Sequence, residues 1–273
     1  MSEINTDKAF TARMEDLCSR ACRTYTPCYT PFLTAKEQVD AKRTVSDFPD
    51  LFVLAFGGFS AAERAILGLF PSDIYLPPEA ENRTDERYRM YEAESGIAFL
   101  QITGSGFTRF DHRDVLGALM ATGLRRETMG DIYVADDGKN AYLAVLQTVA
   151  PFLCDALTGV GRDKVHIKPL AAEDLPQKTE RFADLSVTLA SLRLDALLSG
   201  TLNVSREQAK KLVSSGRVSI NHVECTAVDR PFAEGDIVSV KGHGRFLIDS
   251  FLGKTQKDRF RVIVRKYLYE GTR

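Results

Sequence analysis

Residues 193–221, RLDALLSGTLNVSREQAKKLVSSGRVSIN, contain the strongest local signals in the chain. Ser205 is a favourable helix cap, because Gln208 stands three residues later and the two side chains can satisfy each other's free backbone donors. Gly216 stands where a helix needs a left-handed C-terminal residue. The buried side of this helix would be one apolar stripe, formed by Ala209, Leu212 and Val213. After Gly216, residues 217–221 alternate like a β-strand.

The same stretch is rich in positive charge. Arg206 and Lys210 stand one helical turn apart, Lys211 is adjacent, and Arg217 begins the strand. Cations on a rigid helix bind phosphates and the shape of structured RNA, with little reading of sequence. The alternative is an ordinary solvated surface with an ion pair between Glu207 and Lys211. We favour an RNA-binding surface, and predict that its residues are Arg193, Ser205, Arg206, Lys210, Lys211, Arg217, Asn221, Lys241 and Arg245.

The charge of the 273-residue chain is unevenly distributed, although its net value is only −1. Residues 193–273 contain 15 Lys and Arg against 9 Asp and Glu, whereas residues 1–192 contain 21 against 28. This asymmetry favours a polyanion-binding C-terminal part on an acidic body. The length allows two domains, each with its own core.

Several classes of protein are not indicated by the sequence. There is no apolar run long enough for a membrane span, and the N-terminus lacks the pattern of a secretory signal. The cysteines are few and odd in number, so we expect free thiols in a reducing cytoplasm. No metal-ligand spacing, nucleotide-binding motif or catalytic arrangement is evident, and we expect no cofactor and no metal. The five cysteines are Cys18, Cys22, Cys28, Cys154 and Cys225.

The middle of the chain predicts an α+β domain. Strands are expected at 98–103, 131–135, 141–146 and 164–168, with helices at 111–124 and 148–158. This β-α-β-β-α-β order is ferredoxin-like or RRM-like. An RRM binds RNA through aromatic residues on its central strands in a basic Gly-aromatic motif, whereas the segment 141–145 offers one aromatic, Tyr142, and no Arg-Gly-aromatic run. A scaffold or protein-docking role is therefore favoured, with contacts at Arg125, Arg126 and the loop 107–110.

The N-terminal part predicts helices at 3–24 and from Thr34, a strand at 51–56 and a loop at 71–87. The pattern Ser60 to Glu63 resembles a capping box and predicts a helix through about Leu69. The complete prediction is an α+β protein in five parts. These are an N-terminal helical segment (1–46), the RRM-like domain (47–170), a linker (171–186), a small α+β module (187–250) and a basic strand extension (251–273).

The C-terminal module resembles the RNA-binding domain of ribosomal protein S-four. A helix is expected at 192–199 with its end at Gly200, and strands follow around the Asn221-His222 turn. His222 departs from the resemblance, because this family usually has glycine there, and the turn could be strained. The residues that carry the match are Arg193-Leu194-Asp195, Ser205-Arg206, Ala209, Leu212, Gly216, Arg217-Val218, Asn221 and Gly235-Asp236.

The whole chain is similar to the bacterial YlmH family. The matching segments are 57–59, 62–64, 105–107, 112–119, 125–127, 130–132 and 253–264. The resemblance implies a cytoplasmic, non-enzymatic protein that binds the large ribosomal subunit and tRNA. It also implies a role in rescue of stalled ribosomes, with a link to the cell-division gene neighbourhood. We expect a monomer with no small-molecule substrate.

Two other functions are compatible with the module. Pseudouridine synthases carry it before a catalytic domain that has its own Arg-Leu-Asp. Here the one Arg-Leu-Asp, at 193–195, lies inside the module, so we expect Asp195 to orient Arg193 or a backbone donor and not to act as a catalytic residue. The other alternative is a protein-interaction adaptor that acts through the N-terminal domain.

Overall fold

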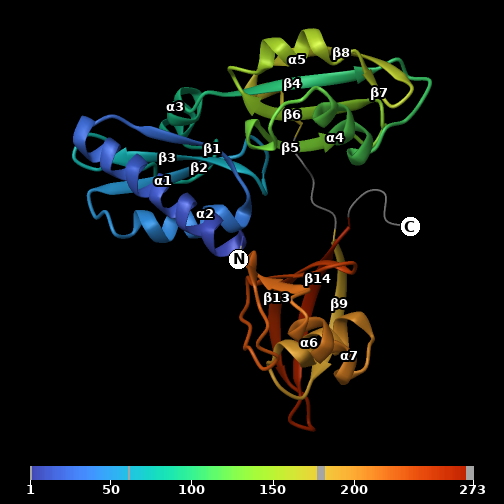
Figure 1. The fold of residues 1–273 in the computed structure, drawn as a ribbon. Helices are drawn as coiled ribbons and strands as arrows, with labels where there is room; N and C mark the ends of the chain where they lie inside the picture. Colours follow the sequence, from blue (N-terminus) through green and yellow to red (C-terminus); the bar gives the residue numbers. More distant parts are fainter. Residues whose placement is uncertain (1, 61, 177–181, 269–273) are drawn as a thin grey trace. The chain divides into compact units, whose positions relative to one another are not determined.

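The computed structural model describes residues 2–60, 62–176 and 182–268. The chain forms two compact units, Met1–Lys178 and Thr179–Arg273. Both are mixed α+β units, in agreement with the predicted fold class (Figure 1).

The first sheet of the N-terminal unit has three antiparallel strands in the order β1-β3-β2. Two helices pack against it, and their inward side chains include Met14, Cys18 and Val45. Thr34 and Glu37 form the predicted capping box at the second helix. The elements are α1 (Ser2–Thr24), β1 (Cys28–Leu33), α2 (Ala35–Val45), β2 (Leu51–Phe56) and β3 (Ala65–Pro71).

The helix predicted from Ser60 to about Leu69 is wrong, because the second half of this segment belongs to β3. All seven residues of β3 are buried, and a continuous apolar run has no periodicity that separates strand from helix. The backbone N–H groups of Glu63 and Arg64 donate to the carboxylate of Asp131, at 2.7 and 3.1 Å. β1 pairs with β3, so the predicted segments 1–46 and 47–170 share a sheet.

The second sheet has the predicted β-α-β-β-α-β order. Its strands lie in the order β5-β6-β4-β8-β7, and every pairing is antiparallel. Helices α4 and α5 cover one face, where Leu100, Leu119 and Leu153 are fully buried. A short helix, α3, precedes the domain and was not predicted. The elements are α3 (Glu86–Glu94), β4 (Ile97–Gly104), α4 (His112–Ala121), β5 (Met129–Val134), β6 (Asn140–Leu146), α5 (Ala150–Ala156), β7 (Gly159–Val160) and β8 (Asp163–Leu170).

The helix-free face of this second sheet is partly covered by the first sheet and its loops. Phe32, Phe59 and Ile66 pack against Phe99 and Ala144. Gly58 allows the close approach, because a Cβ there would lie 2.4 Å from the ring of Phe99, and its φ is +83°. The two sheets of this unit therefore share a small apolar core.

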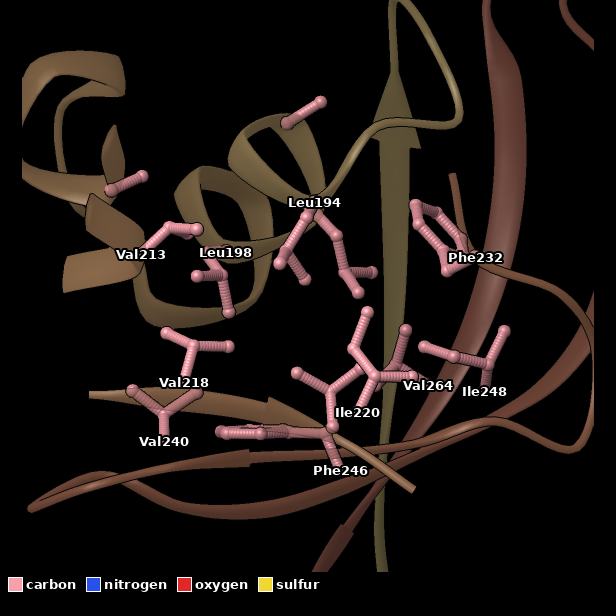
Figure 2. Close-up of a cluster of buried hydrophobic side chains, with 14 of the residues drawn as sticks. Leu194, Leu198, Val213, Val218, Ile220, Phe232, Val240, Phe246, Ile248 and Val264 are labelled. Carbon is pink, nitrogen blue, oxygen red and sulfur yellow. The ribbon is translucent and has the colours of Figure 1, made fainter. Parts of the chain in front are cut away.

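The C-terminal unit is a six-stranded antiparallel sheet with two helices on one face. The strand order is β11-β10-β12-β13-β14-β9. Figure 2 shows Leu194 and Leu198 from α6 and Val213 from α7 directed at sheet residues such as Phe246. The elements are β9 (Phe182–Leu189), α6 (Leu194–Leu202), α7 (Arg206–Ser214), β10 (Val218–Ile220), β11 (Val223–Glu224), β12 (Ile237–Val240), β13 (Gly244–Lys254) and β14 (Phe260–Tyr267).

Helix α6 does not end at Gly200 as predicted. It continues to Leu202, and Asn203 adopts the left-handed conformation that ends it. Gly200 instead faces β9, because a Cβ there would lie 3.2 Å from the side chain of Leu189. The glycine therefore brings helix and strand close together.

The predicted linker and basic extension both contribute to this sheet. Residues 182–186 of the predicted linker belong to β9, whereas 177–181 lie outside the described residues. The extension contributes the end of β13 and all of β14, and its residues 269–273 are also outside them. β14 pairs with β9 along eight positions, so the first and last strands of the unit are neighbours.

Candidate nucleic-acid interface

The N-terminus of α7 has the predicted capping box. The backbone N–H of Gln208 donates to Ser205 Oγ at 3.1 Å, and the N–H of Ser205 donates to Gln208 Oε1 at 2.9 Å. Ala209 and Val213 are fully buried, and Gly216 has a φ of +67°. Ser205 therefore has a structural role at this position, and its predicted RNA contact remains a prediction.

A buried carboxylate holds two of the predicted arginines. Asp195, near the start of α6, is only 1% exposed. Its Oδ1 accepts from Arg193 Nε at 3.3 Å, and its Oδ2 accepts from Arg206 Nη1 at 3.0 Å. The two arginine side chains are still about half exposed, at 45% and 47%. The expected contact with Arg193 is present, and the contact with Arg206 was missed because α6 and α7 meet only in the fold.

Lys210 and Lys211 are exposed on α7, and Lys210 stands one helical turn after Arg206. The ion pair of the alternative interpretation exists, with Lys211 Nζ 3.8 Å from Glu207 Oε1. Both side chains are more than three-quarters exposed, so solvent screens this pair and it is worth little. Lys211 remains available to a polyanion.

The structure brings Arg217 and Lys241 together at one end of the sheet. Arg217 Nη2 donates to the carbonyl of Lys241 at 2.9 Å, and the N–H of Lys241 donates to the carbonyl of Arg217 at the same distance. Gly242 is needed beside them, since it has a φ of +86° and a Cβ would lie 3.2 Å from the guanidinium. Both cationic side chains are exposed.

The amide of Asn221 is used inside the fold. Its Nδ2 donates to Asp236 Oδ1 at 2.8 Å, and its Oδ1 accepts from the N–H of Ile237 at 2.9 Å. The amide therefore joins the hairpin to the turn before β12. The hairpin itself has positive φ at both central residues, Asn221 and His222, as a type I′ turn requires. The RNA contact predicted for Asn221 also remains a prediction.

Arg245 lies on the opposite face of the sheet from the helices. Its neighbour Phe246 is buried under the helices, and successive side chains of a strand point to opposite faces. The guanidinium of Arg245 lies over the ring of Tyr267, 5.1 Å from its centre. The predicted surface from Arg193 to Arg245 therefore spans two faces of this unit.

Most of the residues predicted as contact points on the RRM-like domain interact with other parts of the same domain. Arg126 donates to the carbonyls of Met129 and Gly130, and burial lowers the pKa of its guanidinium, as does nearby Arg64. Phe110 is buried, and Arg125 pairs with Glu127. In the loop 107–110, Phe107 is 94% exposed.

The residues that the structure describes offer no cluster of metal ligands and no disulfide. They contain no group of three or more metal-ligating side chains, and all five cysteines are free. Across the same residues, none of the helices combines the length and the apolarity that a membrane span requires.

Comparison with known proteins gives three domain matches and a relative that is similar over most of the chain. Residues 6–74 match "YlmH, N-terminal", residues 92–174 match "Putative RNA-binding domain in YlmH", and residues 192–238 match the "S4 domain". The chain is 32% identical over 233 residues to "Ribosome-associated protein quality control protein P2" of Bacillus subtilis (strain 168), covering 85% of this chain and 84% of that protein. The chain belongs to the YlmH family.

The YlmH assignment confirms both resemblances seen in the sequence, and the matched domains indicate no enzyme family. A solved structure, "Cell division protein ylmH from Streptococcus pneumoniae", is similar at 20% identity with a TM-score of 0.49, covering 63% of this chain and 95% of that one. The description of the YlmH segment 92–174 as RNA-binding differs from the scaffold or protein-docking role that we favoured for the RRM-like domain.

Proposed function

We propose that this YlmH-family protein is an RNA-binding, ribosome-associated factor in the quality control of stalled ribosomes. The observation that carries the proposal is the arginine pair held by Asp195 beside the exposed lysines of α7. The fixed geometry suits phosphate groups of structured RNA, because the guanidinium groups are placed before the ligand arrives. The S4 domain match and the printed name of the Bacillus relative support the same role.

We further propose which RNA is bound and in what state the protein acts. The RNA contacted is ribosomal RNA of the large subunit together with tRNA, and the protein acts as a monomer in the cytoplasm. It binds RNA without chemical modification. An RNA-modifying activity centred on Asp195 is disfavoured, because this carboxylate is buried and engaged by two arginines. A uridine-isomerisation assay that showed activity lost in Asp195→Asn would reverse this part.

The test is co-sedimentation of the full-length protein with purified large subunits. We expect Lys210→Glu with Lys211→Glu to abolish binding, and wild-type binding to fall steeply with salt because cation–phosphate contacts release counterions. Lys254→Glu with Lys257→Glu is the matched control, since it makes the same charge change at the hairpin between β13 and β14. If the α7 variant still binds large subunits, the result would favour the alternative function, a protein-interaction adaptor that acts through the N-terminal unit.

A further inference from the structure

The helix-free face of the five-stranded sheet is divided into a covered row and a half-exposed row. In the covered row, Ala144, Phe99 and Leu170 are cross-strand partners, and the first two are buried against the first sheet. Two residues further along the strands, the pairings place one residue from each of β5, β6, β4 and β8 side by side. This second row, here named the tyrosine row, consists of Tyr133, Tyr142, Gln101 and Lys168.

The two tyrosines present a fixed aromatic surface. Their ring centres are 6.0 Å apart and the ring planes differ by 24°, which is a stacked arrangement. Tyr133 also contacts Phe59 of the covered region, with ring centres 6.4 Å apart. Both tyrosines are only partly buried, and both pack against the apolar cluster beneath them. Their orientation is therefore set by packing while part of each ring remains accessible.

The surroundings of the tyrosine row are polar and include one lysine, Lys168. Asn140 Oδ1 accepts from Gln101 Nε2 and from Thr103 Oγ1, both at 3.1 Å, so the amides next to the rings are held in place. Lys168 and His166 are exposed at alternate positions of β8. The nearby carboxylate of Asp137 accepts from Asn140 Nδ2 at 2.9 Å and from two backbone N–H groups, so it is engaged in holding this amide.

We propose that the tyrosine row is a stacking site for an unpaired RNA nucleotide, which rests on the proposed RNA-binding function and gives the RRM-like domain a part in it. An aromatic surface stacks a base, fixed amides offer hydrogen bonds to its edge, and the exposed Lys168 at the end of the row offers a cation to a phosphate. These groups suit a nucleotide better than a protein surface, because a protein partner would need apolar or acidic complements. Since the first sheet covers the adjacent row, the site accepts one or two nucleotides.

The test measures binding of full-length protein to fluorescein-labelled single-stranded oligouridylate and oligoadenylate of eight nucleotides, by anisotropy at low salt. We expect Tyr142→Leu to weaken binding about tenfold, since one base–aromatic stack is lost while apolar volume is kept. Tyr142→Phe should bind like wild type. Tyr25→Leu is the matched control, because Tyr25 is 56% exposed in the same unit but far along the chain from the row.

The outcomes separate this proposal from the proposed function. If Tyr142→Leu binds the oligonucleotides as tightly as wild type, the proposed stacking site is wrong. It is also wrong if binding is lost only in the Lys210→Glu, Lys211→Glu double variant. Large-subunit co-sedimentation measured in parallel tests the proposed function by itself. If Tyr142→Leu lowers the unfolding midpoint, Lys168→Glu replaces it, because this exposed side chain can be changed without disturbing the core; unchanged binding in Lys168→Glu would then overturn the proposal.

Discussion

Arg193 and Arg206 of the C-terminal unit and Arg64 and Arg126 of the N-terminal unit are two arginine pairs in different surroundings. The first pair shares the buried carboxylate of Asp195 and remains about half exposed. The second pair donates to backbone carbonyls, and Arg64 reaches those of Phe32, Met129 and Arg126 at 2.9, 3.1 and 3.3 Å. Burial lowers the pKa of both guanidinium groups of the second pair.

The difference shows how an arginine can be kept for a ligand or removed from the surface. A buried carboxylate at the base of a side chain orients it and leaves donors for a ligand, whereas carbonyl acceptors consume the donors inside the fold. Counting charges along the sequence cannot separate these cases. The surface available to a polyanion is therefore smaller in the N-terminal unit than its arginine count suggests.

The largest expected effect comes from removing the carbonyl-bound guanidinium. Arg64→Met keeps most of the stem but leaves three part-buried carbonyls without this donor, so we expect a loss of about 3 kcal/mol in the free energy of unfolding of the N-terminal unit. Urea unfolding followed by circular dichroism measures it. Arg125→Met, whose side chain is 76% exposed, should change little. Equal stabilities of Arg64→Met and Arg125→Met would show that the carbonyl contacts of Arg64 do not stabilise the N-terminal unit.

The second effect concerns the carboxylate-held pair. Asp195→Asn keeps the shape but removes the charge that holds two arginines, so we expect a loss of about 2 kcal/mol in the C-terminal unit. Binding to large subunits should also weaken, because Arg193 and Arg206 lose their fixed positions. Asp229→Asn, at an exposed position of the same unit, is the control. A stable Asp195→Asn variant with normal binding would show that the carboxylate does not organise this surface.

Removal of either helix cap should cost less stability, and each cap should affect only the unit to which it belongs. Thr34→Ala and Ser205→Ala each remove an acceptor for a helix N–H, at a cost of about 1 kcal/mol. Thr34 belongs to the N-terminal unit and Ser205 to the C-terminal unit. Each substitution should therefore shift a different unfolding transition, and this identifies which transition Arg64→Met affects and which one Asp195→Asn affects. A shift of both transitions by one cap would mean that the units do not unfold separately.

The smallest effect tests the solvated-surface interpretation of α7. Glu207→Gln removes the partner of Lys211, and an exposed pair of this kind should change stability by no more than about 0.5 kcal/mol. Removing a negative charge beside the lysines should leave large-subunit binding equal or slightly tighter. Weaker binding in this variant would show that Glu207 positions Lys211.

The sequence was most informative where local chemistry decides the structure. The Ser205 capping box, the left-handed Gly216 and the order of elements in the RRM-like domain were all confirmed. These features depend on a few neighbouring residues or on regular periodicity. The helix expected from Ser60 to about Leu69 was wrong. The backbone N–H groups of Glu63 and Arg64, which a helix cap would have bound, donate instead to Asp131, far along the chain.

Features that depend on strand register could not be predicted. Tyr133 was not grouped with Tyr142, because their contact requires the pairing of β5 with β6. Arg245 was placed with the helix-side cations, because the face of β13 to which it belongs follows from the burial of Phe246. The contacts of Arg206 with Asp195 and of Arg217 with Lys241 join residues 11 and 24 positions apart, so they follow only from the fold.

The pairing of Phe182 with Tyr267 has a consequence for how the C-terminal unit can be rearranged. The segment that matches the S4 domain, 192–238, contains neither strand, and that segment alone would lack three of the sheet's six strands, β9, β13 and β14, and half of β12. Adjacent entry and exit points allow a circular permutant instead. A short linker from residue 267 to 182, with new ends at the exposed 256–258 turn, would keep every strand and make β14 the first strand to be synthesised instead of the last.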